Sequence, residues 1–333
     1  MKRSLVLGAG GFIGNHLVTR LKKQGHFVKA IDLKYPEFSE SEADQFVIGD
    51  LRDPNICQQH LTEDFDEVYQ LAADMGGAGY LFTGENDFNV MHNSGMINLN
   101  VVDCSIKQKI AKVFFSSSAC IYPKTNQVDP NNPNCEEGSA YPADPDSEYG
   151  WEKIFSERVY LAANRNYNLN IRIARFHNVY GPLGTWNSGK EKAPAALCRK
   201  VVESDSTGIV EIWGSGEQTR SFLYIDDCID GVMTLMNSEY KEPVNIGSEE
   251  MVSINKLCET VLEVANKSAE IKHIDGPLGV MGRNSENSLV REKIGWEPKI
   301  DLEEGIGHTY AWIENQMESA SAETQKSAAQ EHE

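Results

Sequence analysis

Residues 4–14 decide the fold of this chain, and they read Ser4-Leu5-Val6-Leu7-Gly8-Ala9-Gly10-Gly11-Phe12-Ile13-Gly14. The apolar run before the glycines predicts a short buried strand, and the pattern after them predicts a helix to Gln24, with Gly25 as its stop signal. A strand, a glycine turn and a helix N-terminus together make a cradle for phosphate, because glycines admit a pyrophosphate and the helix dipole favours an anion. We therefore expect a dinucleotide-binding turn, although its glycine spacing departs from strict GxGxxG. The residues expected to bind there are Gly8, Gly11, Phe12, Ile13 and Gly14.

The second predicted strand runs from Phe27 to Ile31 and ends on Asp32. Its distance from the glycines is about that at which dinucleotide-binding units carry an acidic residue. A carboxylate there accepts hydrogen bonds from the ribose hydroxyls of adenosine and repels a 2′-phosphate. Asp32 therefore predicts NAD rather than NADP, against the alternative that it is a structural residue capping a turn.

Two further strands are predicted at 45–48 and 67–71, and small or acidic residues follow each of them. The carboxyl ends of such strands are where a doubly wound sheet binds its ligand. Asp50, next to Leu51, is expected to reach the adenine amino group, and Ala72 and Ala73 are small enough to let a cofactor pass. We expect all four residues to contact the cofactor.

The first half of the chain therefore alternates strands and helices with glycines at the turns. This alternation predicts an α/β fold with a doubly wound parallel sheet of the Rossmann type, covered by helices on both faces. We expect a NAD-binding Rossmann domain over residues 1–178 and a smaller C-terminal α/β substrate domain over 179–317, with some exchange of chain between the two. The stretch 318–333 lacks hydrophobic periodicity and is expected to be disordered.

The composition excludes several classes of protein. A formal net charge of −19 argues against sequence-independent binding to nucleic acid and against docking on anionic lipid. Seven cysteines without a CxxC pair exclude a zinc ribbon and a disulfide framework, and they indicate a reducing compartment. No apolar run approaches the roughly 18 residues of a membrane span, and the early strand leaves no room for a signal peptide. We expect a cytoplasmic protein that binds no metal, no membrane and no nucleic acid.

A helical pattern begins at Tyr149 and places Lys153 one turn later, on the same helix face. An ammonium group beneath a phenol favours the phenolate, so we expect Lys153 to draw the pKa of Tyr149 down from about 10 toward neutrality. A phenolate beside a nicotinamide can take a proton from an alcohol while a hydride leaves. Ser118, just past the strand-like run 112–115, is placed to hold that alcohol. The alternative is an ordinary exposed helix face.

These features in combination resemble the extended branch of the short-chain dehydrogenase/reductase superfamily, whose members bind NAD tightly in a Rossmann domain and nucleotide-sugars in a smaller C-terminal domain. A closer resemblance, to the GDP-mannose 3,5-epimerase family of that superfamily, covers nearly the whole chain except the tail. The chain departs from this family's pattern in the 79–89 loop and in the 124–140 crossing, which both border the expected sugar pocket. The matching motifs are 72–77 (AADMGG), 117–123 (SSACIYP), 175–178 (RFHN), 184–186 (GTW), 191–196 (EKAPAA), 218–222 (QTRSF) and 282–285 (GRNS).

The resemblance implies a reaction that converts GDP-mannose to GDP-L-galactose and, as a further product, GDP-L-gulose. Hydride passes from C4 of the hexose to bound NAD while Tyr149 takes the hydroxyl proton, with Lys153 tuning it and Ser118 orienting the hydroxyl. The 4-keto group makes the C3 and C5 protons acidic. An acid/base pair, Cys120 and Lys192, then exchanges those protons on opposite faces of the ring before the hydride returns to C4.

Both members of that pair need a lowered pKa, because an unperturbed Cys at about 8.5 and an unperturbed Lys at about 10.4 are too basic for efficient exchange at pH 7. A nearby cation lowers the pKa of a thiol, and burial or a neighbouring positive charge lowers that of an amine. On the residues alone, the simpler interpretations are that Cys120 is a buried small apolar residue and Lys192 a solvated surface charge.

A nucleotide diphosphate bound by a protein of this charge needs specific cations. Arg suits bidentate contacts with phosphate and Lys a point-charge contact, so we expect Arg220, Arg283 and Lys200 to bind the diphosphate. The resemblance implies a GDP-hexose substrate and a homodimer formed through a pair of helices. The full set expected at the substrate is Met75, Gly76, Ser118, Cys120, Asn178, Glu191, Lys192, Ala193, Lys200, Gln218, Thr219, Arg220 and Arg283.

Two other interpretations stay open. The first is another 4-keto reaction on the same fold, by a nucleotide-sugar C4 epimerase or a 4,6-dehydratase. A dehydratase is expected to carry an Asp-Glu pair near Ser118, where Ala119 and Cys120 stand. The second is a non-catalytic NAD-binding regulatory protein, a role that the same fold can host. Its usual sign is the loss of Tyr149 or Lys153, and both are present.

Overall fold

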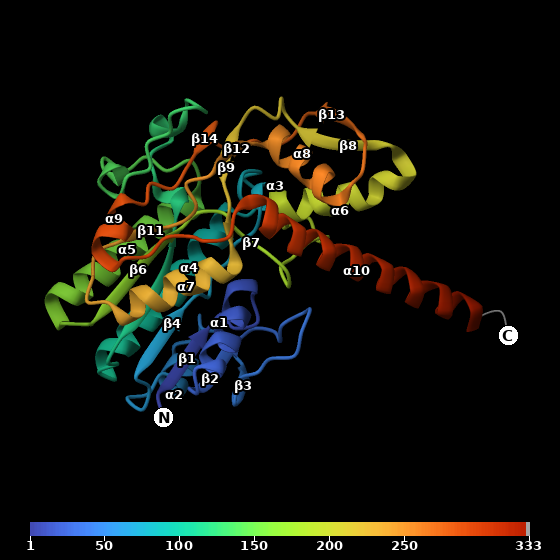
Figure 1. The fold of residues 1–333 in the computed structure, drawn as a ribbon. Coiled ribbons are helices and arrows are strands. Elements are labelled where there is room, and N and C mark those ends of the chain that lie inside the picture. The colour runs from blue at the N-terminus through green and yellow to red at the C-terminus, as the bar shows by residue number, and fades with distance from the viewer. Residues whose placement is uncertain (331–333) are drawn as a thin grey trace.

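The computed structural model describes the backbone of residues 1–330 and the side chains of residues 1–204 and 208–320. Its centre is a seven-stranded parallel sheet in the order β11-β6-β5-β4-β1-β2-β3 (Figure 1). Chain order therefore reverses between β1 and β4, which is where a doubly wound sheet binds its ligand. The strands are β1 (Arg3–Leu7), β2 (Phe27–Asp32), β3 (Gln45–Ile48), β4 (Glu67–Gln70), β5 (Val113–Ser118), β6 (Ile171–Phe176) and β11 (Val244–Ile246).

Successive residues of these strands point to opposite faces of the sheet and enter two separate cores. On one face, Val6 belongs to a core shared with α1 (Phe12–Lys23) and α7 (Ile225–Asn237). On the other face, Leu5 and Leu7 belong to a second core. The helices of that second core are α2 (Pro54–His60), α4 (Asp87–Lys107) and α5 (Glu148–Tyr167). Helices thus cover both faces of a parallel sheet, and the predicted fold class is confirmed.

The second part of the chain is built on three small sheets and a layer of helices (Figure 1). Helices α6 (Ala193–Thr207), α8 (Ile254–Ala265) and α10 (Leu302–Gln330) pack on one another. The small sheets pair β8 (Ile209–Trp213) with β13 (Glu270–Ile274), β7 (Val179–Tyr180) with β10 (Leu223–Tyr224), and β9 (Thr219–Ser221) with both β12 (Met251–Ser253) and β14 (Gly282–Arg283). The remaining short helices are α3 (Ala78–Leu81), α9 (Ser288–Ile294), η1 (Ala119–Ile121), η2 (Lys124–Gln127) and η3 (Glu137–Ala140).

Elements from the second part return to the first. Strand β11 pairs with β6 at the edge of the large sheet, and α7 packs on the same face as α1. The core on that face continues without interruption into the second part, as far as Ile313. The division of the chain at residue 178 stays a prediction.

The last helix, α10, differs from the disorder expected for residues 318–333. Its buried residues Leu302, Ile306, Tyr310 and Ile313 lie at helical spacing and anchor its first half. The backbone continues as helix to Gln330, through a stretch rich in Ala, Glu and Gln, which are strong helix formers even where an apolar stripe is missing. Residues 331–333 lie outside the described residues.

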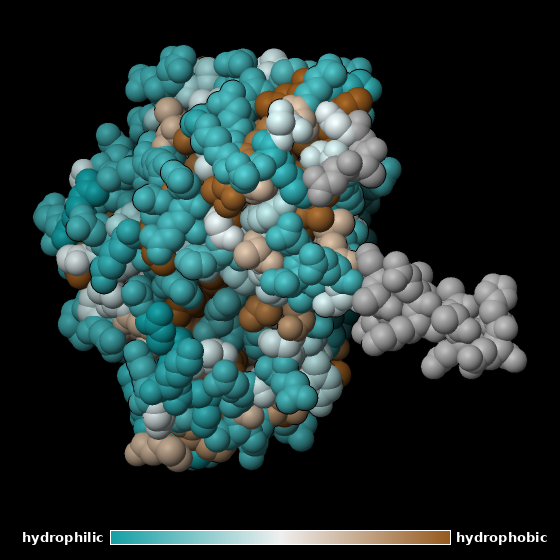
Figure 2. All heavy atoms as spheres, turned by 45° about the vertical axis from the view of Figure 1, so that its right-hand side comes forward, coloured by the Kyte–Doolittle hydropathy of each residue, from teal (hydrophilic) through white to brown (hydrophobic). Residues whose placement is uncertain are grey.

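The surface is largely hydrophilic. In the face shown in Figure 2, hydrophobic residues occur in small groups between hydrophilic ones, as expected for a chain of net charge −19. None of the helices in the described part of the chain combines the length and the hydropathy that crossing a bilayer requires.

Candidate active site

A cavity of about 960 Å³ lies at the carboxyl ends of the central strands. One wall is formed by the glycine turn after β1 and by the residues that follow β2, β4 and β5. The other wall comes from the N-terminus of α6 and from the loops around Trp213 and Leu278. The cavity thus lies between the large sheet and the second part of the chain, at the position predicted for a ligand.

The glycine turn after β1 is a tightly packed cradle. A Cβ on Gly14 would lie 2.1 Å from the carbonyl oxygen of Gly8, and a Cβ on Gly8, whose φ is +83°, would lie 2.6 Å from the amide nitrogen of Ala72. Gly11 is the N-cap of α1 and offers no side chain to cap it, so the first amide groups of α1 remain for a ligand. This arrangement fits a pyrophosphate bound at a helix N-terminus.

Asp32 ends β2 and lines the cavity. Its Oδ2 accepts a hydrogen bond from the amide of Gly10 at 2.9 Å, and its Oδ1 accepts one from the amide of Lys34 at 3.3 Å. Burial raises the pKa of Asp32, while these backbone hydrogen bonds act in the opposite direction. Asp50 also lines the cavity, but its carboxylate is occupied by Arg52, whose hydrogen bonds lower the pKa of Asp50.

Tyr149 and Lys153 lie one turn apart on α5, with the ammonium 5.5 Å from the centre of the phenol ring. The pKa of Tyr149 is nevertheless raised, not lowered, because burial outweighs the other influences and Cys120 and Glu152 also disfavour the phenolate. A hydrogen bond with Ser118 acts in the opposite direction. The expected lowering of this pKa is therefore wrong for the protein without ligands, because sequence spacing gives no measure of burial.

Lys153 is held from beneath the site. Its Nζ donates to the carbonyl of Ser116 at 3.2 Å and lies 3.8 Å from the carboxylate of Glu152, and both charged side chains are only 1% exposed. Burial lowers the pKa of Lys153, and Glu152 opposes that effect. The fixed ammonium lies below the Tyr149 ring, as the helix spacing predicted.

Cys120 and Lys192 reach the same cavity from elements that are far apart in the sequence. Cys120 lies in η1, directly after β5, and its amide donates to the Ser118 hydroxyl at 3.2 Å. Lys192 is the N-cap residue of α6. Burial lowers the pKa of Lys192, with Cys120 close enough to oppose the effect. The shift of Lys192 has the direction that an acid/base role requires.

The cavity collects almost all residues expected at the site. Every expected cofactor residue lines it, as do all expected substrate residues except Thr219. The Thr219 hydroxyl instead donates to the carbonyl of Pro130, outside the cavity. Two lining residues carry a buried side-chain oxygen that has no hydrogen-bond partner among the described residues, Glu191 (Oε2) and Gln218 (Oε1). Such acceptors are suited to hydroxyl or amino donors of a polar ligand.

The expected cations of the substrate site differ in their partners. Lys200 donates to the carbonyl of Glu211 at 2.7 Å, and Arg220 donates to the carbonyls of Thr219 and Val280, each at 2.7 Å. Arg283 contacts the thiol of Cys120 instead, with Nη1 at 3.1 Å from Sγ.

Sequence reasoning missed a group of residues that line the cavity, which includes Asp74, Tyr80 and Lys190. The hydroxyl of Tyr80 donates to Asp74 at 2.8 Å, and Lys190 lies 3.9 Å from the centre of the Tyr80 ring. The amide of Gly77 also donates to the carbonyl of Lys190 at 2.9 Å, so the segment 75–80 is joined to the loop that carries Lys192. The 72–77 motif contains Asp74 and Gly77, but no spacing predicts their association with Lys190, which lies more than 100 residues later in the chain.

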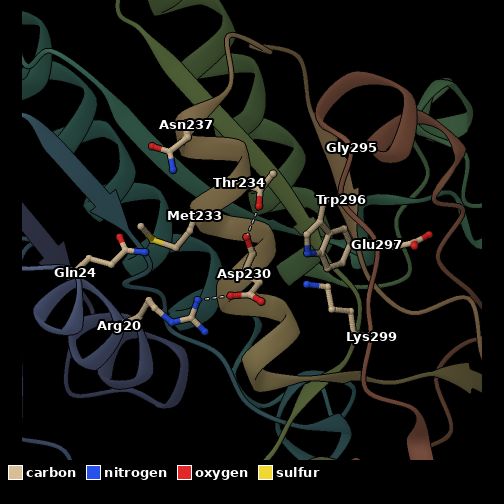
Figure 3. A pocket seen from close by; sticks show the side chains of 10 residues that line it. All are labelled: Arg20, Gln24, Asp230, Met233, Thr234, Asn237, Gly295, Trp296, Glu297 and Lys299. Atoms are coloured by element: carbon tan, nitrogen blue, oxygen red, sulfur yellow. Dashed lines mark hydrogen bonds and ion pairs between the residues drawn. The ribbon is translucent and has the colours of Figure 1, made fainter.

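A second, more open pocket lies on the face of the large sheet that α1 and α7 cover, between these helices and the segment 295–299 (Figure 3). Arg20 of α1 forms an ion pair there with Asp230 of α7, and Trp296 lies beside them. None of the expected site residues lines this pocket. The ion pair joins the two helices that cover that face.

Comparison with known proteins agrees with this geometry. Residues 4–247 match the NAD dependent epimerase/dehydratase family. The chain is 46% identical to a GDP-mannose 3,5-epimerase of Arabidopsis thaliana over 95% of this chain and 83% of that protein, and 44% identical to GDP-mannose 3,5-epimerase 1 of Oryza sativa subsp. indica over 95% and 82%. Among solved structures, a UDP-N-acetylglucosamine 4-epimerase of Methanobrevibacter ruminantium is similar, with a TM-score of 0.83, 26% identity, and 95% and 99% of the two chains covered. The chain has a cavity at the reversal point of a parallel sheet, lined by a glycine turn, an acidic strand end and a Tyr-Lys helix face. The family match over residues 4–247 and the 46% identity over 95% of the chain show that it belongs to the NAD dependent epimerase/dehydratase family.

Proposed function

We propose that this chain is a GDP-mannose 3,5-epimerase, an NAD-dependent isomerase that forms GDP-L-galactose and, as a further product, GDP-L-gulose. The observation that carries the proposal is the meeting of Cys120 and Lys192 with Tyr149 in one cavity. An enzyme that only oxidises and reduces C4 has no use for the additional thiol and amine. The two plant relatives named above carry this activity in their names.

The residues that would hold NAD fit it. At Gly8 and Gly14 there is no space for a side chain, so the turn stays open to a pyrophosphate. The uncapped amides at the start of α1 face the cavity, and Asp32 provides the acceptor for ribose hydroxyls. NAD bound there would supply an acceptor for the C4 hydride in the oxidation and, once reduced, a hydride donor for the final reduction. A carboxylate at position 32 repels the additional phosphate of NADP.

Tyr149 takes the C4 hydroxyl proton as the C4–H bond breaks, and it returns that proton when the bond re-forms. The buried phenol needs positive charge to act as a base, and Lys153 lies fixed on the correct side of it. Ser118 hydrogen-bonds the phenol and orients the hydroxyl of the sugar.

Cys120 and Lys192 exchange the protons on carbons next to the C4 ketone. A carbonyl makes these protons acidic, so groups with pKa values nearer neutrality can remove them and return them on the other face. Burial moves the pKa of Lys192 in this direction. Around them, Met75, Gly76, Asn178, Glu191, Ala193, Lys200, Gln218 and Arg220 line the substrate half of the cavity.

The second candidate is a nucleotide-sugar C4 epimerase or 4,6-dehydratase, which the similar UDP-N-acetylglucosamine 4-epimerase structure favours at the level of fold. The experiment that separates the candidates is incubation of the NAD-loaded protein with GDP-mannose in deuterated water. Deuterium at both C3 and C5 supports our proposal, and deuterium at C5 alone indicates a C5-only product. Deuterium at neither position, with turnover of the sugar, overturns the proposal in favour of a C4 epimerase.

We also propose that the protein is a homodimer of the cytoplasm. Trp151, Phe155 and Arg158 form an exposed stripe on α5 at helical spacing. Helix α4, which packs beside α5, exposes Phe88 and Leu99. Apolar side chains gathered on two neighbouring helices are suited to burial against a second copy. A reducing compartment fits the seven free cysteines.

A further inference from the structure

Arg283 is fixed against the thiol of Cys120 by the protein itself. It lies in β14 and is 5% exposed, and each of its three nitrogens has a partner. Nη1 donates to Cys120 Sγ at 3.1 Å, Nε to Gln127 Oε1 at 2.5 Å, and Nη2 to Asp146 Oδ2 at 3.3 Å. A planar guanidinium held at two nitrogens has no freedom to turn its third away from the sulfur.

The side-chain amide of Gln127 has only one orientation in which its oxygen can accept the hydrogen bond from Arg283 Nε. It is fully buried, and its amide nitrogen donates to the carbonyls of Tyr122 at 2.9 Å and Pro123 at 3.2 Å. With both amide hydrogens used, the Gln127 oxygen must point the other way, toward Arg283. The backbone carbonyl of Gln127 accepts a hydrogen bond from the backbone amide of Met281 at 3.1 Å, so the segment before β14 is also bonded to Gln127.

Asp146 supplies the negative charge that a buried guanidinium needs. Its side chain is 8% exposed and forms an ion pair with Arg283. Asp146 lies just before α5, the helix of Tyr149, so it connects the Arg283 guanidinium to the element that carries the proposed C4 base. Neither Gln127 nor Asp146 lines the cavity, so each acts through Arg283.

Arg283 and the neighbouring Arg220 differ in the partners of their guanidinium groups. The two residues stand side by side in register on β9 and β14. Within the described part of the chain, Arg220 has no carboxylate at ion-pair distance and donates to carbonyl oxygens. A full positive charge at the cavity wall suits a diphosphate. Arg283, with its charge shared between Asp146 and the sulfur of Cys120, is suited to the proton-exchange step.

We propose that Gln127 and Asp146 are positioning residues, which hold Arg283 so that its guanidinium supports Cys120 during the exchange of carbon-bound protons. As a base, the Cys120 thiolate takes the proton of the C–H bond and becomes a thiol, and the electron pair stays on the enolate of the 4-keto sugar. As an acid, the thiol gives its proton to the enolate carbon and becomes a thiolate. The sulfur is a negative thiolate before it acts as a base and after it acts as an acid. In both states the N–H of Arg283 faces the sulfur, and its proton stays on the Arg283 nitrogen.

This inference rests on the proposed epimerase function and predicts a loss confined to one stage of it. In Gln127→Met and Asp146→Ala, the rate of deuterium incorporation from deuterated water into GDP-mannose should fall ~10- to 100-fold, the effect of losing a charge-assisted hydrogen bond. Reduction of the bound NAD by GDP-mannose, followed by absorbance in a single turnover, should stay within about twofold of the wild type, and KM should be unchanged. Asp146→Asn keeps an oxygen acceptor and should recover part of the rate lost in Asp146→Ala.

The matched control is Asp144→Ala, two residues from Asp146, whose carboxylate pairs on the surface with Lys124 and does not line the cavity. It should exchange deuterium like the wild type. Parallel loss of NAD reduction and exchange, an increase of KM alone, or unchanged exchange in both Gln127→Met and Asp146→Ala would overturn the inference. Wild-type protein that incorporates no deuterium would instead overturn the proposed function, so the two failures are distinguishable. Melting temperatures identify a variant that fails to fold, in which case Asp146→Asn carries the comparison.

Discussion

Gly150 of α5 lies directly against the backbone carbonyl of Cys120. A Cβ at position 150 would come within 2.2 Å of that oxygen and within 2.7 Å of the Cβ of Pro145. Because Gly150 follows Tyr149, this contact sets how closely the helix that carries the phenol approaches the 3-10 helix that carries the thiol. The relative position of the two proposed catalytic groups thus depends on a residue without a side chain.

Gly150→Ala should therefore impair the site more than it impairs the helix. Alanine is a better helix former than glycine, but its methyl group forces α5 and η1 apart, and overpacking of this kind costs about 1–3 kcal/mol. We expect a lower melting temperature and at least a tenfold lower kcat. Gly138→Ala is the control, because nothing lies within 4 Å of a Cβ there. Equal activity of the two variants would show that the contact does not set the catalytic distance.

Asp32→Asn should separate stability from cofactor binding. Burial raises the pKa of Asp32, so its favourable contribution to stability is present below the unfolded-state pKa and is lost as the pH rises through the folded-state pKa. At neutral pH the negative charge of Asp32 thus destabilises the NAD-free protein. Asp32→Asn should therefore raise the free energy of unfolding near pH 7, and the decline of this free energy above pH 4 should be smaller in the variant than in the wild type. The affinity for NAD should fall ~10- to 100-fold, and the ratio of the affinity for NAD to that for NADP should decrease. Calorimetric titration and melting curves between pH 4 and 8 measure both; unchanged discrimination would contradict the assignment of Asp32.

Cys120→Ala and Tyr149→Phe should block different stages of the reaction. Loss of the thiol removes one member of the proton-exchanging pair, so deuterium incorporation should stop while the bound NAD is still reduced by GDP-mannose. Loss of the phenol hydroxyl should abolish both signals, because no group remains to take the C4 proton. Absorbance of the reduced cofactor and mass spectrometry of the sugar measure the two stages. Full epimerase activity in Cys120→Ala would show that another residue exchanges the protons.

The first half of the fold could be read from the sequence because its signals are local. Strand β3 covers the predicted residues 45–48, and β2 ends on Asp32. Alternation of apolar residues and glycine stop signals act within a few residues. Strand β11 could not be found in this way, since its three residues join the large sheet only through pairing with β6, about 70 residues earlier.

Most residues expected at the candidate site line one cavity, and the pKa of Lys192 is lowered as expected, but the pKa of Tyr149 is not. Tyr149, Lys153 and Lys192, which the sequence singled out, line one cavity. The pKa of Tyr149 moves opposite to the expectation, because burial raises it and the hydrogen bond with Ser118 is too weak to offset the burial. The contact of Arg283 with Cys120 joins residues 163 positions apart. No pattern of spacing encodes such a contact, which arises from the pairing of β14 with β9.

Glu157→Ala should destabilise the protein strongly, although Glu157 itself does not line the cavity. Arg175 of β6 and Glu157 of α5 form a doubly hydrogen-bonded ion pair at 2.9 and 2.8 Å, with side chains 3% and 1% exposed. Removing the carboxylate leaves a buried, unpaired guanidinium, which costs about 3–5 kcal/mol. Urea unfolding should show this loss, and the double variant Glu157→Leu with Arg175→Met should recover most of it. Glu263→Ala, which breaks an exposed pair with Lys256, is the control and should leave stability unchanged.

Phe155→Glu should convert the proposed dimer into a monomer. Phe155 is 47% exposed on α5 and Leu99 is 44% exposed on α4, so each of two neighbouring helices presents a large apolar side chain to solvent. In a symmetric interface each such residue occurs twice, so one substitution brings two carboxylates into the contact and opposes association. Light scattering after size exclusion should give the mass of two chains for the wild type and the mass of one chain for Phe155→Glu. The control Ile48→Glu, at a similarly exposed position on the edge of the sheet, should keep the mass of two chains. Because the cavity is formed within one chain, the monomer should still bind NAD; a Phe155→Glu variant that stays dimeric would place the interface on another face.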